Sequence, residues 1–392
     1  MNVSIKKVLS IVLFRCLGAG CSFLITLVLM KELTVIDYAY FSFVFSIFTA
    51  AMLLPSIGIN NAYVVNSTNI SMQDYENSKL IVTLGFLFIL LVSSVFIEKI
   101  YIYSILAGLL GASFDHVLSK YQASENFKVY NFLLPLRSIL LLLIMIVVLH
   151  FFNEDFIDAY FKSISIIFFI SILIYLLYSK TRLRNKPLNS LKKLINVSKG
   201  FIVFEVSVLV LMRLEVWLLT FFVGVGYLNS QSVAYYWAAF SFIFLLPIIS
   251  SSLTTILLPT LKKNNSLEGA KAKLILIFLS MIILYISIAC IAIEFLFGEK
   301  YEETLIILPI MGVGVFFSFI ANLERLSLVA LGKEKKGNIV SYCQLAVSLL
   351  VNIALIPLLG LYGAVLAFVS VRLTSLLGFY FILKKEKNHF YT

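Results

Sequence analysis

The chain has 392 residues, of which 61% are hydrophobic and only 13% are charged. Soluble domains hold about 25% charged residues, so this composition excludes an ordinary soluble fold. The formal net charge is +11, but the basic residues lie in short segments between apolar runs. That distribution indicates membrane topology and not nucleic-acid binding, because the chain has no basic domain.

The apolar runs are long enough to cross a membrane. A run of about 20 residues spans the bilayer core, where a backbone must satisfy its own hydrogen bonds as a helix or a closed barrel. The runs lack the alternation of barrel strands, so we predict helices. The predicted fold class is an all-α polytopic membrane protein with twelve transmembrane helices, over residues 8–30, 38–59, 80–97, 100–119, 130–152, 160–178, 201–224, 233–259, 274–296, 304–331, 339–358 and 362–383.

The basic residues set the orientation of these helices. With the N-terminus inside, the cytoplasmic segments hold 22 of the 31 Lys and Arg residues, and the outer segments hold only four, Lys31, Lys99, Lys162 and Lys300. Cytoplasmic segments of membrane proteins carry such an excess. We therefore predict that both termini lie in the cytoplasm. The first run is not a cleavable signal peptide, because it contains Arg15 and no small-residue cleavage site follows it.

The longest cytoplasmic connection divides the predicted helices into six plus six. Residues 179–199 hold seven basic and no acidic residues. A plain topogenic loop explains this stretch, and binding of anionic lipid head groups is the alternative. We predict an N-terminal six-helix lobe over 1–190 and a C-terminal six-helix lobe over 191–392.

The two predicted lobes show weak internal similarity. Polar and small residues follow an arginine at the same offsets in the first and seventh helices, as Arg15, Ser22 and Thr26 and as Arg213, Thr220 and Gly224. Parallel repeats of this kind place the substrate of a transporter between them. Chance similarity between apolar helices is the alternative interpretation.

Five arginines lie inside predicted helices, where each costs roughly 2.5–3.5 kcal/mol on insertion scales unless it finds a partner or water. Arg15, Arg213 and Arg372 are nearest to mid-helix, and Arg137 and Arg325 lie closer to helix ends. Two interpretations remain open. The arginines form ion pairs that fix helix packing, or they line a cationic cavity for an anionic substrate.

Acidic residues also occur in the predicted helices. Glu205 and Glu215 share the seventh helix with Arg213. At 100° per residue, Glu215 points about 200° away from Arg213, so at least one of these charges must meet another helix. We identify Glu205 and Glu215 as candidates for binding a coupling proton or sodium ion.

Sequence motifs of enzymes are missing. The chain has no phosphate-binding Gly-x-x-x-x-Gly-Lys-Ser/Thr loop, no histidines at metal-ligand spacing and no Gly-x-Ser-x-Gly nucleophile motif. The four cysteines lie in apolar runs without metal or redox spacing. We predict no enzymatic activity, no metal and no cofactor.

The most specific motif runs from Asn352 to Ala364 and reads Asn-Ile-Ala-Leu-Ile-Pro-Leu-Leu-Gly-Leu-Tyr-Gly-Ala. It resembles the Asn-x4-Pro-x2-Gly-x2-Gly-Ala signature of the O-antigen and capsule (Wzx-type) flippases of the multidrug/oligosaccharidyl-lipid/polysaccharide exporter superfamily. Arg213-Leu214-Glu215 is similar to the start of that family's seventh helix, although Asp is more usual at the position of Glu215. The resemblance covers nearly the whole chain.

The resemblance implies a MATE-like bundle in the bacterial inner membrane that flips an undecaprenyl-diphosphate-linked oligosaccharide to the outer leaflet by alternating access. Arg15, Arg213 and Arg372 would attract the diphosphate, with Arg137 and Arg325 also in the cationic cavity. The coupling ion would be H+ or Na+. Further implied partners are membrane lipids and polysaccharide polymerase or assembly proteins.

Three alternatives remain at this stage. A MATE-like drug or cation antiporter would favour an acidic cavity, which the central arginines oppose. A membrane glycan polymerase or ligase would need catalytic residues clustered on the outer face. A non-transporting scaffold would leave glycan export intact when the central arginines are replaced.

Overall fold

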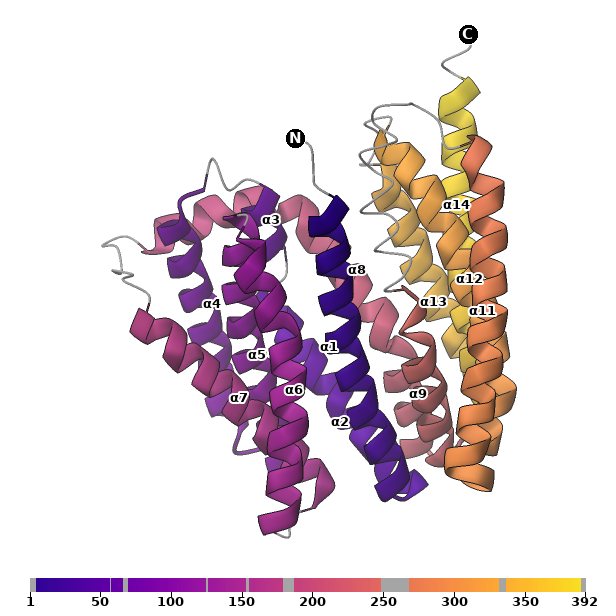
Figure 1. Cartoon of the computed structure of the whole chain (residues 1–392), viewed down its shortest axis with the longest axis horizontal. Helices are drawn as coiled ribbons and strands as arrows, with labels where there is room; N and C mark the ends of the chain where they lie inside the picture. Colours follow the sequence, from indigo (N-terminus) through magenta and orange to yellow (C-terminus); the bar gives the residue numbers. More distant parts are fainter. Residues whose placement is uncertain are drawn as a thin grey trace. The chain divides into compact units, whose positions relative to one another are not determined.

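The computed structural model describes residues 5–56, 58–65, 70–124, 126–152, 155–178, 187–247, 268–330 and 336–388. These residues form helices joined by short turns, and no strand occurs among them (Figure 1). The α-helices and short 3-10 helices (η) are α1 (Ile5–Glu32), α2 (Val35–Leu53), η1 (Leu54–Ser56), α3 (Ile59–Val65), α4 (Met72–Ser93), α5 (Lys99–Ala123), α6 (Phe127–Phe152), α7 (Phe156–Tyr178), α8 (Pro187–Gly224), α9 (Gln231–Ile243), α11 (Glu268–Phe297), η2 (Gly298–Tyr301), α12 (Glu302–Ala330), α13 (Gly337–Leu359) and α14 (Leu361–Asn388).

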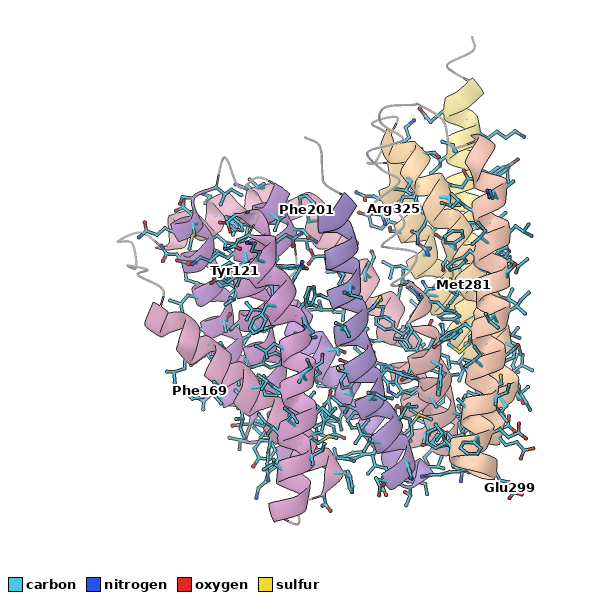
Figure 2. All side chains as sticks on the ribbon, viewed as in Figure 1. Tyr121, Phe169, Phe201, Met281, Glu299 and Arg325 are labelled. Carbon is cyan, nitrogen blue, oxygen red and sulfur yellow. The ribbon has the colours of Figure 1, made fainter. Side chains whose placement is uncertain are left out.

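The helices are those of a multi-pass membrane protein. Within the described ranges, nine helical stretches are long and apolar enough to cross a membrane, and one of them runs through α11 and α12. Large apolar side chains are also exposed on the outer faces of helices, such as Phe169 of α7, which is 59% exposed (Figure 2). So much exposed apolar surface suits lipid and not water. The all-helical membrane fold is confirmed, while the count of twelve and the cytoplasmic placement of both ends stay predictions.

Several predicted boundaries differ from the structure, three of them near breaks in the chain. The helix predicted over 38–59 ends at Leu53 and gives way to η1, so the run is broken before α3 begins. Part of the predicted linker 179–199 is helical, because α8 already begins at Pro187. α9 ends at Ile243, and residues 248–259 of the helix predicted over 233–259 lie outside the described residues.

The early start of α8 has a physical cause. Its first turns are amphipathic, since Leu194 and Ser198 are buried whereas Lys192 and Lys199 are exposed. An amphipathic helix of this kind buries one face against the protein and solvates the other. Residues 179–186 of the predicted linker lie outside the described residues.

The chain forms two compact units. The first comprises Met1–Val12, Thr26–Ser42 and Val210–Thr392, and the second comprises Leu13–Ile25 and Phe43–Leu209. α1, α2 and α8 therefore each contribute residues to both units. The lobes predicted over 1–190 and 191–392 follow from topology, and that division stays a prediction.

Glycine permits close helix contact at several points. In the second unit, a Cβ added to Gly108 of α5 would lie 2.5 Å from the Phe48 carbonyl oxygen and 2.7 Å from the Ala51 Cβ, both on α2. Backbone atoms cannot move aside as a flexible side chain can. Gly108 therefore sets the distance between α2 and α5.

We expect Gly108→Ala to lower the free energy of unfolding by about 1–3 kcal/mol, because overpacking at a tight helix contact forces the backbone apart. Thermal unfolding of the purified protein in detergent measures the loss. Gly85→Ala in α4 is the matched control, since an added Cβ there meets nothing within 4 Å. Equal melting temperatures for the two variants would contradict the close contact.

Candidate functional site

α8 places two opposite charges on different neighbours, as the 200° separation of Arg213 and Glu215 requires. The guanidinium carbon of Arg213 lies 5.0 Å from the ring centroid of Trp237 on α9, a cation–π contact. Glu215 is only 3% exposed. The positive charge of Arg372 on α14 and the side-chain amide of Asn352 on α13 both act on it. The first unit thus holds one predicted coupling residue and one predicted substrate-binding arginine.

The surroundings of Arg372 leave little room for other groups. Its guanidinium carbon lies 4.7 Å from the centroid of the Phe368 ring one turn earlier on α14. A Cβ added to Gly314 of α12 would come within 2.8 Å of that ring and 3.5 Å of the Arg372 Cγ. Asn352 is fully buried and donates to the Ser348 carbonyl at 2.8 Å. We call Glu215, Asn352 and Arg372 the core cluster.

Arg15 occupies a different environment in the second unit. Its Nη2 donates to the hydroxyl of Tyr130 on α6 at 3.5 Å. Two turns later, the hydroxyls of Ser22 and Ser138 share a hydrogen bond of 2.9 Å. The predicted polar stripe of α1 therefore lies along α6.

Arg137 is held by aromatic rings. Its guanidinium carbon lies 5.9 Å from the ring centroids of both Phe114 on α5 and Phe168 on α7. It is also close enough to Asp115 for the two charges to attract. These contacts give Arg137 a role in packing α5, α6 and α7 together.

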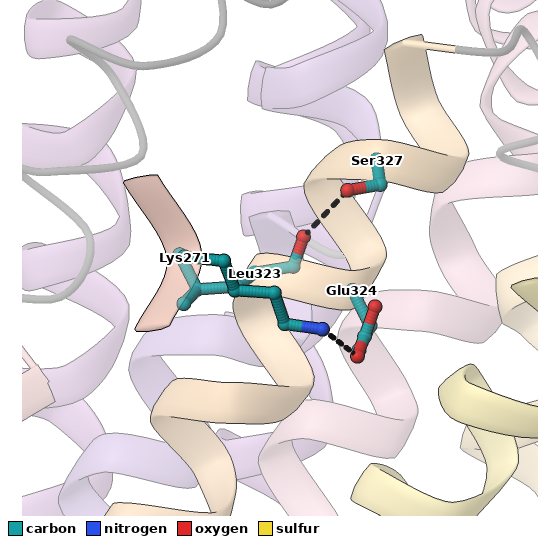
Figure 3. Close-up of polar contacts among 4 residues, drawn as sticks. All are labelled: Lys271, Leu323, Glu324 and Ser327. Atoms are coloured by element: carbon teal, nitrogen blue, oxygen red, sulfur yellow. Dashed lines mark hydrogen bonds and ion pairs between the residues drawn. The ribbon is translucent and has the colours of Figure 1, made fainter. Parts of the chain in front are cut away.

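Arg325 and Glu324 face different surroundings, although they are adjacent in α12. Glu324 is 4% exposed and accepts a short hydrogen bond from Lys271 of α11 (Figure 3). Arg325 is exposed (Figure 2). Glu324 is therefore neutralised from another helix, as expected for neighbouring residues that cannot face each other.

Glu205 stabilises the break after α2. Its two carboxylate oxygens accept hydrogen bonds from the backbone N–H of Gly58 at 2.7 Å and from the Asn61 side chain at 2.6 Å. Gly58 has a φ of +70°, and a Cβ there would lie 2.9 Å from the backbone nitrogen of Ile202 on α8. Glycine is therefore required for both the turn and the contact.

Lys79 binds η1, which lies just before the Gly58 turn in the same break. Its ammonium donates to the Pro55 carbonyl at 3.1 Å and to the Ser56 hydroxyl at 2.8 Å, and the residue is 3% exposed. The charges of Asp115 and Glu205 both act on it. We call Lys79, Asp115 and Glu205 the break cluster.

The break cluster was only partly predicted. The helix predicted over 80–97 leaves Lys79 just outside its start, whereas α4 begins at Met72 and includes Lys79; the cytoplasmic side of Lys79 stays a prediction. The polar residues Asp74, Glu76 and Asn77 hide this start from a hydropathy window. The one signal was Pro55 followed by Gly58 within a predicted helix, since both residues are typical of helix breaks.

We expect Lys79→Met to lower the free energy of unfolding by about 1.5–3 kcal/mol, the usual contribution of hydrogen bonds to a charged group. The substitution leaves the Pro55 carbonyl without its ammonium donor and removes a cation that acts on both Asp115 and Glu205. Thermal unfolding compared with Lys128→Met provides the test, because Lys128 is exposed. Equal melting temperatures for Lys79→Met and Lys128→Met would show that the hydrogen bonds of Lys79 do not stabilise the break.

A separate prediction concerns the coupling between Glu215 and Arg372 in the core cluster. We expect Glu215→Leu and Arg372→Leu each to lower the free energy of unfolding by about 0.5–3 kcal/mol, since each removes a buried charge that stabilises the other. The loss of unfolding free energy in the double variant should be smaller than the sum of the losses in the two single variants. A double-mutant cycle on thermal unfolding measures the coupling. Additive losses would show that the two charges do not interact.

Comparison with known proteins gives one sequence relative and several structures. No protein-family model matches the chain. It is 24% identical over 392 residues to "Capsular polysaccharide biosynthesis protein CapF" of Staphylococcus aureus, an alignment that covers 94% of this chain and 96% of CapF.

Two solved structures match along nearly the whole chain. A variant of the Vibrio cholerae MATE transporter VcmN has a TM-score of 0.65 at 17% identity, covering 98% of this chain and 97% of VcmN. The lipid II flippase MurJ, in an inward closed conformation, has a TM-score of 0.67 at 16% identity, covering 97% of this chain and 88% of MurJ. The chain is a membrane protein with the fold shared by MATE transporters and MurJ.

Proposed function

We propose that the protein flips undecaprenyl-diphosphate-linked oligosaccharide repeat units, for O-antigen or capsule, across the bacterial inner membrane by alternating access. The signature Asn352–Ala364 and the relation to a capsular polysaccharide biosynthesis protein support this substrate class. The MATE and MurJ fold supports the transport mode. On this proposal the product passes to polysaccharide polymerase or assembly proteins.

The observation that carries the proposal is the set of arginines kept in apolar helices. Arg213 and Arg372 lie on aromatic faces in the first unit, and Arg15 lies beside the Tyr130 hydroxyl in the second. A guanidinium is the side chain best suited to a diphosphate, because its donors form a fork that matches two oxygens. A charge in such helices is expensive, which makes it a functional candidate.

The five arginines take different parts in this proposal. Arg15, Arg213 and Arg372 are the diphosphate-binding residues. Arg137 supports the helices around it through Phe114 and Phe168. Arg325 is exposed near the end of α12, where it would meet the substrate, if at all, only at entry.

Glu215 is the better of the two candidates for ion coupling. Both carboxylate oxygens of Glu205 already accept hydrogen bonds from the segment after α2. On Glu215, by contrast, the positive charge of Arg372 acts. A diphosphate that binds Arg372 competes with Glu215 for the same cation. A carboxylate that loses its cation in a buried site takes up a proton or a sodium ion, which would link substrate binding to ion binding.

The alternative of a drug or cation antiporter draws on the same residues. Glu215 is a buried carboxylate of the kind that binds a cationic drug. The positive charge of Arg372, which acts on Glu215, opposes that role because it would also repel a cationic drug. The anionic substrate therefore fits the core cluster better.

We expect Arg15→Ala, Arg213→Ala and Arg372→Ala each to reduce surface polysaccharide by at least about tenfold in a host that lacks its own flippase, since each removes a charge-assisted contact to the diphosphate. Immunoblotting of surface glycan measures export, and membrane fractionation confirms insertion. Lys128→Ala is the control, because Lys128 is exposed and lies near the start of α6.

Normal export by all three inserted variants would rule out the cationic site. If the arginine variants exported glycan normally but changed the resistance of the host to drugs, the antiporter would be favoured. The coupling step has its own readout, because Glu215→Gln should abolish the dependence of export on the ion gradient while Glu205→Gln should not.

A further inference from the structure

Lys300 caps the end of a helix that lies far away in the sequence. Its ammonium donates to the carbonyls of Met30 at 2.8 Å, Lys31 at 2.9 Å and Leu33 at 2.6 Å. An ammonium has three donor hydrogens, so these bonds use all of them. The last carbonyls of α1 have no partner within the helix and lie at the negative end of its dipole. A cation fits this position.

Tyr301 extends the same contact. It is fully buried, its hydroxyl donates to the Met30 carbonyl at 3.4 Å, and its ring meets the Tyr38 ring edge-on at 6.0 Å. Gly298, with a φ of +55°, turns the chain from α11 into η2. We call Lys300, Tyr301 and the α1 carbonyls they bind the outer latch.

The outer latch is built to be released. The Lys300 ammonium donates only to neutral carbonyls, and the one carboxylate that acts on it, Glu32, is exposed. Because Lys300 is half-buried, water can take the place of the carbonyls without leaving a buried charge behind. The core cluster and the Lys271–Glu324 pair differ, because each of their cations would leave a buried carboxylate behind. Among these contacts, the outer latch is the one that opens most readily.

The latch also lies where an outer gate is needed. Lys300 is one of the few basic residues predicted on the outer side, and Met30–Leu33 connect the first two predicted helices there. It joins a segment of the predicted N-terminal lobe to a segment of the predicted C-terminal lobe. Both segments belong to the first compact unit. Separation of the predicted lobes on the outer side would have to break it.

We propose that Lys300 is the releasable latch of the outer gate, and that opening toward the outside begins when its ammonium leaves the carbonyl end of α1. This inference rests on the proposed transport function, because only alternating access requires the outer side to open. Lys300 is then a positioning residue that controls how often the gate opens, and it does not touch the substrate.

The test measures access to a buried position one turn after Tyr38, whose ring contacts Tyr301 of the latch. Ser42 of α2 is fully buried, and its hydroxyl donates to the Tyr38 carbonyl at 2.6 Å. Ser42→Cys is introduced into a protein whose four natural cysteines have been replaced, namely Cys16, Cys21, Cys290 and Cys343. Intact cells are then treated with a membrane-impermeant maleimide, and the labelling rate from outside is measured.

Lys300→Met should raise that rate about tenfold, the factor expected from losing hydrogen bonds to a charged donor. Lys300→Arg keeps a cation and donors, and should stay near the parent rate. Lys31→Met is the matched control, because it removes a neighbouring charge while the Lys31 backbone carbonyl remains in the latch. Equal rates for Lys300→Met and Lys31→Met would overturn the proposal.

The latch and the transport function fail in different ways. Faster labelling of Lys300→Met in a protein whose arginine variants export glycan normally would leave the latch intact and reject the cationic site. Unchanged labelling together with loss of export in the arginine variants would keep the flippase and reject the latch. Thermal unfolding of Lys300→Met, compared with Lys300→Arg, shows whether faster labelling reflects a local opening and not general unfolding, which would also count against the latch.

Discussion

Lipid offers no hydrogen bonds and no countercharges, so a polar group inside an apolar helix must find its partner in the protein. The described charges meet this constraint in different ways. The charge of Arg372 acts on Glu215, Lys271 donates a hydrogen bond to Glu324, and the backbone N–H of Gly58 donates to Glu205. Each of these contacts links segments that are far apart in the sequence. The placement of charges thus decides which helices pack together, in a chain whose apolar side chains would pack almost equally well against lipid.

The helical fold could be predicted from hydropathy because it depends on local sequence. Runs of apolar residues decide where a helix lies in a membrane, and the boundaries of α5, α6, α12 and α13 follow the predictions within four residues. The break before α3 could not be predicted in the same way, although Pro55 and Gly58 are present. Its stability depends on Lys79 and Glu205, which lie far from it in the sequence.

The candidate site shows the same limit. Periodicity indicated that Arg213 and Glu215 must face different neighbours, and they do. It could not indicate that the neighbours are Trp237 and Arg372, because contacts between different helices leave no pattern within the sequence of one helix. Lys79 and Lys300 were counted only as markers of topology. Both proved to cap irregular or terminal backbone, a role that depends on carbonyls no sequence pattern displays.

The dependence of the α2–α3 break on Glu205 also constrains how the protein is made. The hydrogen bond to the Gly58 N–H joins residues 147 positions apart. At about 5–20 residues per second, the ribosome needs on the order of ten seconds or more between them. During that interval the amide has no carboxylate partner, although Lys79 arrives far earlier. The N-terminal helices therefore complete their structure only after the beginning of α8 has been synthesised, so insertion and folding of this region are separate events.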